Sequence, residues 1–164
     1  MLNYRRCLKV FMLALLFVLA TGVLVQAATK VPDFILQSVP EKIEINIKDY
    51  RGQVVLVTFW ATWCGPCVQE IPALISLQDA FGPQGFSVLA ISMDQGGARV
   101  VEKMMKKTKI NYPVVMGDSK VSKAFGGVFG LPTSFLIDQS GNAVKRYIGW
   151  VSHDVLEAEI KKLL

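Results

Sequence analysis

The hydrophobic positions of this chain follow two periods, and each period predicts one kind of element. Residues 54–60 and 86–93 are mostly apolar runs, and a glycine lies shortly before each of them. Runs of this length are typical of strands that are buried on both faces of a sheet. Residues 64–81 and 98–107 have the pattern of helices, the second with apolar pairs spaced by four residues.

The second half of the chain continues the alternation with shorter elements. We expect a short strand at residues 112–116 and a short helix at 119–125. Residues 133–138 and 143–147 predict a hairpin, because a turn of polar residues and glycine separates them. Residues 152–164 have the pattern of a closing amphipathic helix.

One more strand is predicted upstream of the first buried run. Ile43, Ile45 and Ile47 alternate with charged or polar residues, which is the period of a strand. Gly52 lies in the following turn, so we expect a hairpin-like entry into the strand at 54–60. Strands that alternate with helices, closed by a hairpin and a helix, predict one α/β domain.

The first part of the chain has the composition of an export signal. Residues 1–9 carry three cations and no acid, and residues 10–25 are uncharged and almost wholly apolar. The Val-Gln-Ala sequence that ends at Ala27 fits a cleavage site, so we expect a signal peptide at 1–27 and an exported domain at 28–164. An uncleaved membrane anchor is the alternative, although the apolar run is shorter than the about 20 residues of a spanning helix.

This leader also accounts for most of the basic charge. The whole chain has a formal net charge of +5, and removal of residues 1–27 would lower it to +2. So small a charge gives no reason to expect nucleic acid as a partner. Of the three cysteines, Cys7 lies in the leader, so the mature chain keeps only Cys64 and Cys67. One pair does not make a disulfide-stapled scaffold, and we interpret the pair as reactive.

Cys64 and Cys67 belong to the sequence Trp-Cys-Gly-Pro-Cys, between a predicted strand and a predicted helix. At a helix N-terminus, free N–H groups and the helix dipole favour a thiolate, and a thiolate attacks disulfides. We expect Cys64 to be the exposed nucleophile, and Cys67 to lie deeper and to resolve the mixed disulfide. A structural disulfide is the alternative. Zinc needs more ligands than these cysteines and the one histidine, His153, provide, so we expect no metal.

These residues and three further segments resemble one known family. The cysteine motif after a Phe-Trp-Ala strand resembles the thioredoxin superfamily. The segments that are similar to its TlpA/ResA branch, which includes the CcmG-type reductases, are Pro32-Asp33-Phe34, Tyr50-Arg51-Gly52 and Gly130-Leu131-Pro132-Thr133. The resemblance implies a thioredoxin-like fold: a central mixed sheet flanked by helices, an N-terminal β-hairpin and an inserted αβ unit near residues 95–118.

The resemblance also implies roles for residues around the cysteines. Thioredoxin-like proteins hold the proline that matches Pro132 in cis, which leaves the backbone of Leu131 free to pair with a substrate strand. An ordinary loop proline is the alternative. Trp63 would form an exposed apolar rim beside Cys64, and a Gly65-Pro66 pair goes with reducing behaviour in the family.

Glu70 is the acid that matches the TlpA/ResA pattern. Plain thioredoxins have a buried aspartate where this chain has Thr58, and a hydroxyl does not carry a proton as a carboxylate does at neutral pH. Glu70 lies about one turn beyond Cys67, so we expect it to handle the proton of that thiol. The alternative is a solvated glutamate on the helix surface, since charged side chains are mostly exposed.

We therefore expect an exported thiol–disulfide oxidoreductase that reduces protein disulfides, with no cofactor besides its cysteine pair. The resemblance implies a disulfide-containing substrate protein, such as apocytochrome c, and a membrane electron donor of the DsbD/CcdA type. We expect a monomer in the periplasm or on the outer face of the cytoplasmic membrane, tethered there by its N-terminus if the leader is retained.

Two other functions share parts of this pattern. A peroxiredoxin would need Pro-x-x-x-Thr-x-x-Cys, and Val57 and Ala61 occupy the proline and threonine positions before Cys64. A copper carrier for respiratory assembly would use the two thiols as soft ligands. Related carriers have a wider cysteine spacing and a histidine, which this motif does not match.

Overall fold

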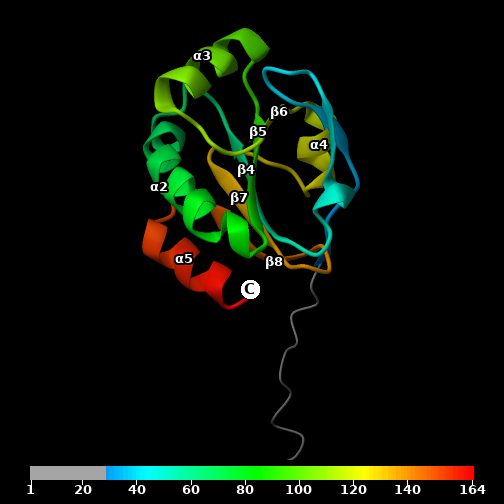
Figure 1. Cartoon of the computed structure of the whole chain (residues 1–164). Coiled ribbons are helices and arrows are strands. Elements are labelled where there is room, and N and C mark those ends of the chain that lie inside the picture. The colour runs from blue at the N-terminus through cyan, green and yellow to red at the C-terminus, as the bar shows by residue number, and fades with distance from the viewer. Residues whose placement is uncertain (1–28) are drawn as a thin grey trace, which may run out of the picture.

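The computed structural model describes residues 29–164 (Figure 1). The predicted signal peptide or anchor at 1–27 lies outside the described residues. The strands are β1 (Thr29–Lys30), β2 (Ile35–Gln37), β3 (Glu44–Asn46), β4 (Val54–Trp60), β5 (Phe86–Ser92), β6 (Val114–Met116), β7 (Thr133–Ile137) and β8 (Asn142–Ile148). The helices are α2 (Gly65–Phe81), α3 (Ala98–Thr108), α4 (Ser119–Ala124) and α5 (His153–Lys161), with 3₁₀ helices η1 (Ile47–Tyr50) and η2 (Gly82–Gln84). None of the described helices is long and apolar enough to cross a membrane.

Six strands form one mixed sheet in the order β1-β8-β7-β4-β5-β6. The neighbours β4, β5 and β6 are parallel, whereas the pairs β4–β7, β7–β8 and β1–β8 are antiparallel. Helix α3 and edge strand β6 form the expected αβ insertion between β5 and the C-terminal hairpin. This architecture confirms the predicted thioredoxin-like fold.

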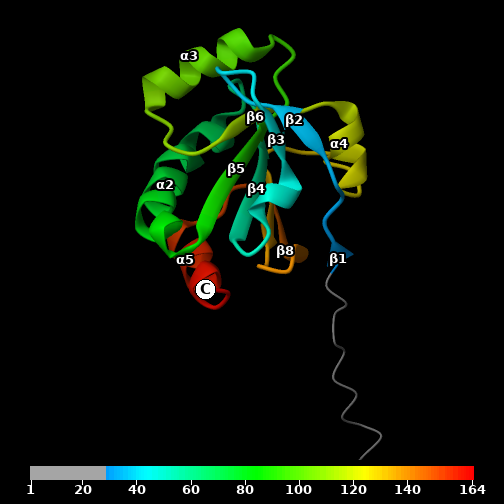
Figure 2. The ribbon, with the colours of Figure 1, turned by 45° about the vertical axis from the view of Figure 1, so that its right-hand side comes forward.

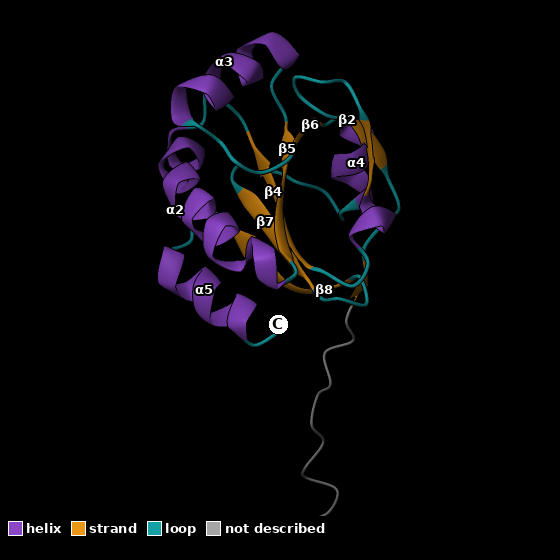
Figure 3. Ribbon diagram, in the orientation of Figure 1, coloured by secondary structure: helices purple, strands orange, loops and turns teal. Residues whose placement is uncertain are grey.

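Alternate residues of the central strands supply two cores, one on each face of the sheet. Leu56 packs in the core that α2, α3 and α5 cover, and Val57 packs in the core that α4 and η1 cover. Figures 1 and 3 show α2 and α5 beside one face of the sheet and α4 beside the other. Every residue of β4 and β5 is buried, because both faces are covered. Coverage of both faces explains why their sequences are mostly apolar.

The N-terminal hairpin is present, but its pairing differs from the predicted entry into β4. Strand β3 pairs antiparallel with β2, with Asn46 opposite Ile35. The strand ends there because the Asn46 side chain caps η1 by accepting the Lys48 N–H at 3.0 Å. The hairpin attaches to the main sheet through a bridge between Ser38 and Val115, which brings it beside β6 (Figure 2).

The two ends of the sheet carry different segments. Strand β4 finishes at Trp60, and the antiparallel β7 begins beside it at Thr133. The loops that carry the two cysteines and Pro132 therefore meet at this end. Strand β1 pairs with the beginning of β8, where Thr29 lies opposite Ala143, and so lies at the other end.

Candidate active site

Cys64 caps helix α2 at the end of the sheet where β4 finishes. Its backbone is extended, and its Sγ accepts a hydrogen bond from the Cys67 N–H at 3.3 Å. Pro66 lies in the first turn, where the missing N–H of proline leaves no hydrogen bond unmade. The sulfur is therefore at the positive end of the helix dipole, which favours the thiolate when the pair is reduced.

Cys64 and Cys67 form a disulfide, with their Cα atoms 5.3 Å apart. Cys64 is 6% exposed and Cys67 is 2% exposed. The expectation of an exposed Cys64 is therefore wrong for this oxidised form, although Cys64 is the more accessible of the two. Cys64 lines a pocket whose other walls are formed by Trp63, Pro66, Met93, Val128, Phe129, Gly130 and Leu131.

Two exposed aromatic side chains line this pocket. Trp63 is 69% exposed, as expected of an apolar rim, and Phe129 is 95% exposed. Phe129 was not singled out from the sequence, although its signal is there: an aromatic residue between Gly127 and Gly130, in a loop with no apolar pattern to bury it. Large exposed apolar side chains beside a reactive pair suit contact with another polypeptide.

Leu131 lines the same pocket as Cys64, and the Leu131–Pro132 peptide bond is cis, as predicted. The Pro132 carbonyl accepts the Gly149 N–H at 2.8 Å, which joins this loop to the end of β8. Among the described residues, no hydrogen bond involves the backbone of Leu131. That backbone is available for pairing with an extended chain in the pocket.

Glu70 is buried in the folded protein, with 2% of its surface exposed. Its Oε1 accepts the backbone N–H of Val151 at 3.2 Å. Burial raises the pKa of the carboxyl to about 7, and the bond from Val151 opposes that rise. These observations exclude a solvated surface glutamate. Glu70 lies three residues after Cys67 on α2, and residues with this spacing are neighbours on a helix surface.

Thr58 is buried and engaged with another hydroxyl. Its Oγ1 accepts a hydrogen bond from the Ser134 hydroxyl at 2.9 Å. The phenol of Tyr112 is a neighbour of Glu70: burial raises the pKa of Tyr112, and the Glu70 charge raises it further. Of positions 58 and 70, only Glu70 therefore carries a buried carboxyl, and its part in proton transfer stays a prediction.

Two residues near the site were missed from the sequence. Val151 acts only through its backbone N–H, so its side chain gives no signal. Asp94 accepts hydrogen bonds from Thr62, just before Cys64. Its signal is a carboxylate that directly follows a buried strand in a parallel sheet, at the edge where functional side chains gather.

In the described part of the chain, one group of side chains has the ligand types of a metal site. The ligand atoms of His153, Asp154 and Glu157 lie within 4.8 Å of one another. Glu157 is already paired with Lys161, Oε1 to Nζ, at 2.7 Å. The group contains neither cysteine of the pair, so the geometry gives no support to a thiol–histidine copper site.

A thioredoxin-like fold with a Cys-x-x-Cys disulfide at the start of α2 and a cis proline in the adjoining loop defines a thiol–disulfide oxidoreductase. A model of the AhpC/TSA family matches residues 27–146. The chain belongs to this family and, within it, to the ResA-like thiol–disulfide oxidoreductases.

Individual relatives agree over most of the chain. Thiol-disulfide oxidoreductase ResA of Bacillus thuringiensis (strain Al Hakam) is 31% identical over 138 residues, which cover 84% of this chain and 79% of the relative. The ResA of Bacillus subtilis (strain 168) is 33% identical over 126 residues, which cover 76% and 69%. The crystal structure of a thiol:disulfide interchange protein of the thioredoxin family from Chlorobium tepidum TLS superposes with a TM-score of 0.75 and 32% identity, covering 83% of this chain and 96% of that one.

Proposed function

We propose that this protein is an exported reductase of protein disulfides. The observation that carries the proposal is the Cys64–Cys67 pair at the N-terminus of α2, in which Cys64 lines a pocket together with Leu131. Reduced Cys64 attacks one sulfur of the substrate disulfide, and the other substrate sulfur leaves as a thiolate. Cys67 then attacks Cys64, the second substrate sulfur leaves, and the protein keeps the new disulfide.

Glu70 handles the proton in the second step. Cys67 must lose its proton before it attacks, and it is buried, so water has little access to it. A carboxyl with a pKa of about 7 is divided between its two forms at neutral pH, which suits a group that accepts a proton and gives it back. Support for this role comes from the burial of Glu70 and its place one turn after Cys67.

The walls of the pocket bind the substrate. Trp63 offers a large apolar surface beside Cys64, and the unpaired backbone of Leu131 offers hydrogen bonds to an extended segment. Pro132 precedes β7 directly, so this backbone is fixed to the central sheet. The Gly65-Pro66 pair between the cysteines favours a low reduction potential, by its resemblance to thioredoxin.

The reductase direction requires a supply of electrons outside the cell's reducing interior. A membrane donor of the DsbD/CcdA type would return the Cys64–Cys67 disulfide to dithiol. Apocytochrome c, or another protein with an oxidised cysteine pair, would be the substrate. The basic and apolar residues 1–27 support export, either as a cleaved signal or as a retained anchor.

Trapping tests the proposal. In Cys67→Ser the resolving thiol is absent, so the substrate should remain attached to Cys64 as a mixed disulfide that mass spectrometry identifies. The matched control is Cys64→Ser, and both variants carry Cys7→Ser to remove the leader thiol. Adducts on Cys64→Ser, or none on Cys67→Ser, would contradict the assigned roles. An adducted protein without a cysteine pair would contradict the substrate class.

The same preparations separate the two other functions. A peroxidase would consume peroxide at Cys64, but the position of its expected threonine is taken by Ala61, which has no hydroxyl. A copper carrier would bind Cu(I) tightly through Cys64 and Cys67 and would lose binding when either becomes serine. We expect disulfide reduction by the wild type, with no peroxide turnover and no stoichiometric copper uptake.

A further inference from the structure

Asp94 follows strand β5 and accepts three hydrogen bonds with one carboxylate. Its Oδ2 accepts the backbone N–H of Thr62 at 2.9 Å and the Ser92 hydroxyl at 2.9 Å. Its Oδ1 accepts the Thr62 hydroxyl at 2.6 Å. Asp94 is only 8% exposed, so water competes little for these bonds. Hydrogen bonds to a carboxylate are stronger than those between neutral groups.

The segment that this carboxylate holds is the turn that leads into Cys64. Thr62 lies two residues before that cysteine. Within the turn, the Cys64 N–H donates to the Ala61 carbonyl at 3.1 Å. Next to it, the Met93 N–H donates to the Trp60 carbonyl at 2.8 Å. The turn is therefore attached to the end of β5 by a backbone bond and by the buried carboxylate.

We propose that Asp94 is a positioning residue of the disulfide exchange: by holding Thr62, it keeps Cys64 at the N-cap of α2. The inference rests on the proposed function, in which Cys64 is the nucleophile. At the N-cap the sulfur receives the Cys67 N–H at 3.3 Å. A sulfur that moves away from this N–H loses the hydrogen bond and the field of the helix dipole, and its thiolate is less stable.

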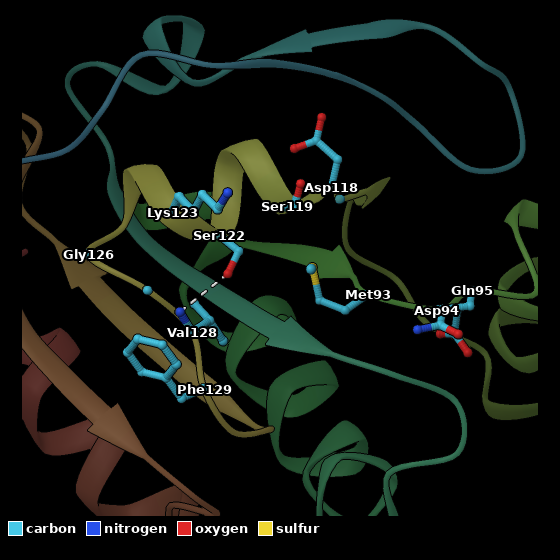
Figure 4. A pocket seen from close by; sticks show the side chains of 12 residues that line it. Met93, Asp94, Gln95, Asp118, Ser119, Ser122, Lys123, Gly126, Val128 and Phe129 are labelled. Carbon is cyan, nitrogen blue, oxygen red and sulfur yellow. Dashed lines mark hydrogen bonds between the residues drawn. The ribbon is translucent and has the colours of Figure 1, made fainter.

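Asp94 could change the pKa of the Cys64 thiol through its position or through its charge, and removal of Asp94 shifts that pKa in opposite directions in the two cases. Figure 4 shows Asp94 on one side of a pocket, and on the other side Asp118, which precedes α4, and Lys123 of α4. A negative charge near a thiol raises the pKa of that thiol, so loss of the Asp94 charge alone would lower the pKa of Cys64. Loss of the hydrogen bonds between Asp94 and Thr62 would raise the pKa of Cys64.

Two substitutions of Asp94 use this difference. Both are made in a Cys7→Ser, Cys67→Ser background, so that Cys64 is the one thiol, and its alkylation rate is followed across pH. Asp94→Ala should raise the pKa of Cys64 by about one unit, which lowers the thiolate fraction by up to about tenfold at pH values below that pKa. Asp94→Asn should stay within about half a unit of the parent, because its amide can still accept the Thr62 N–H and can donate to the Thr62 hydroxyl.

An unchanged or lowered pKa of Cys64 in Asp94→Ala would overturn the proposal. Thr62→Val gives a second test should Asp94→Ala not fold: it removes the hydroxyl bond and should raise the pKa of Cys64 by a smaller amount. Thr62→Ser keeps the hydroxyl and should restore the parent value. No shift in Thr62→Val, or no rescue in Thr62→Ser, would also count against the proposal.

The matched control is Asp118→Ala, in the same pocket. Asp118 caps α4 by accepting the Val121 N–H at 2.8 Å, and it has no hydrogen bond to the cysteine turn. Its loss should lower stability and leave the pKa of Cys64 unchanged. An equal rise of that pKa in Asp118→Ala would indicate general loosening and would overturn the positional role of Asp94.

The alkylation test is independent of the proposed substrate reaction. If Cys64 were not the nucleophile, Cys67→Ser would trap nothing, while Asp94→Ala could still shift the pKa of Cys64. If the positioning role alone were wrong, trapping would succeed and the shift would be missing. The two failures are therefore distinguishable.

Discussion

The carboxylate of Glu70 accepts a hydrogen bond from the backbone N–H of Val151, 81 positions later in the chain. Two residues before Val151, the Gly149 N–H donates to the Pro132 carbonyl at 2.8 Å. The short segment 149–151 therefore contacts the acid on α2 and the proline loop before β7. This arrangement fixes Glu70 without a cation, so burial dominates its pKa.

The rate of disulfide reduction should depend on Glu70 through its protonation. Glu70→Gln keeps the size of the side chain and an oxygen for the Val151 bond, but it does not titrate. We expect a rate loss of about 10²-fold or more at neutral pH, typical of a lost general base, and the loss of the rate inflection near the Glu70 pKa. The measurement is the pH–rate profile with a protein disulfide. Identical profiles for wild type and variant would remove Glu70 from the mechanism.

Stability should depend on pH through the same carboxyl. Burial raises its pKa from 4.5 to about 7, so the folded state binds a proton more readily than the unfolded chain. The stabilisation is complete below the unfolded pKa and is lost as the pH rises through the folded pKa. Wild type should thus lose up to about 3 kcal/mol of unfolding free energy over this window relative to Glu70→Gln.

Urea unfolding of the oxidised protein at a series of pH values measures this effect. The control is Glu44→Gln, because Glu44 is exposed on β3 and should leave the pH dependence of the wild type intact. A Glu70→Gln variant with the same slope as wild type would show that the buried carboxyl keeps an ordinary pKa.

Cys64 should be the more reactive thiol of the reduced protein. Its place at the N-cap of α2 predicts a pKa below the about 8.5 of a free cysteine, whereas the buried Cys67 lacks this position. Alkylation of Cys64→Ser and Cys67→Ser across pH compares the two, with Cys7→Ser in each. Faster reaction of Cys67 would reverse the roles of the two cysteines.

Trp63 should matter for protein substrates and not for small disulfides. Trp63→Ala should lower kcat/KM for a protein disulfide about tenfold, as loss of an aromatic interface residue does. Reduction of a small disulfide and the unfolding free energy should change little, because 69% of the side chain is exposed. Ile35→Ala is the control, since Ile35 is 56% exposed on the N-terminal hairpin, away from the cysteine pocket. Equal losses for both kinds of substrate would mean that Trp63 affects Cys64 itself.

The reduction potential should be near that of thioredoxin. The Gly65-Pro66 pair predicts a value close to about −270 mV and not the about −120 mV of a strong oxidant such as DsbA. This gap of about 150 mV corresponds to about 7 kcal/mol for two electrons, enough to set the direction of exchange. Equilibration with glutathione of known ratio measures it. A value near that of DsbA would overturn the reductase direction and leave the class of enzyme unchanged.

The sequence predicted the elements that are defined by local pattern. The runs at 54–60 and 86–93 correspond to β4 and β5, because strands that are covered on both faces are mostly apolar. The cysteine motif predicted its own helix, because capping and proline placement are local. Strand pairing was harder to predict. Of the alternating Ile43, Ile45 and Ile47, only Ile45 lies in β3, because η1 begins at Ile47, and the strand pairs with β2.

Contacts between distant segments account for what the sequence missed at the site. Cys64 shares its pocket with Phe129 and Leu131, which lie more than sixty residues later in the chain. The hydrogen bond from Thr62 to Asp94 joins residues 32 positions apart. The hydrogen bond to Glu70 comes from the backbone N–H of Val151. Periodicity carries no information about such pairs. Glu70 could be singled out from the sequence because its position matches an acid in the TlpA/ResA pattern, and this resemblance does not depend on knowing the distant contacts.

The pairing of β1 with the start of β8 has a consequence for how the protein would work at a membrane. The chain enters the domain at Thr29, beside Ala143, and β8 then runs about 17 Å to Ile148 at the end that carries the cysteines. If residues 1–27 stay in the bilayer as an anchor, they hold the domain by the end of the sheet opposite to the one that carries Cys64. An enzyme anchored in this way would react with disulfides at a distance from the lipid surface. A membrane-embedded electron donor would then need a domain that extends to the same distance from the bilayer.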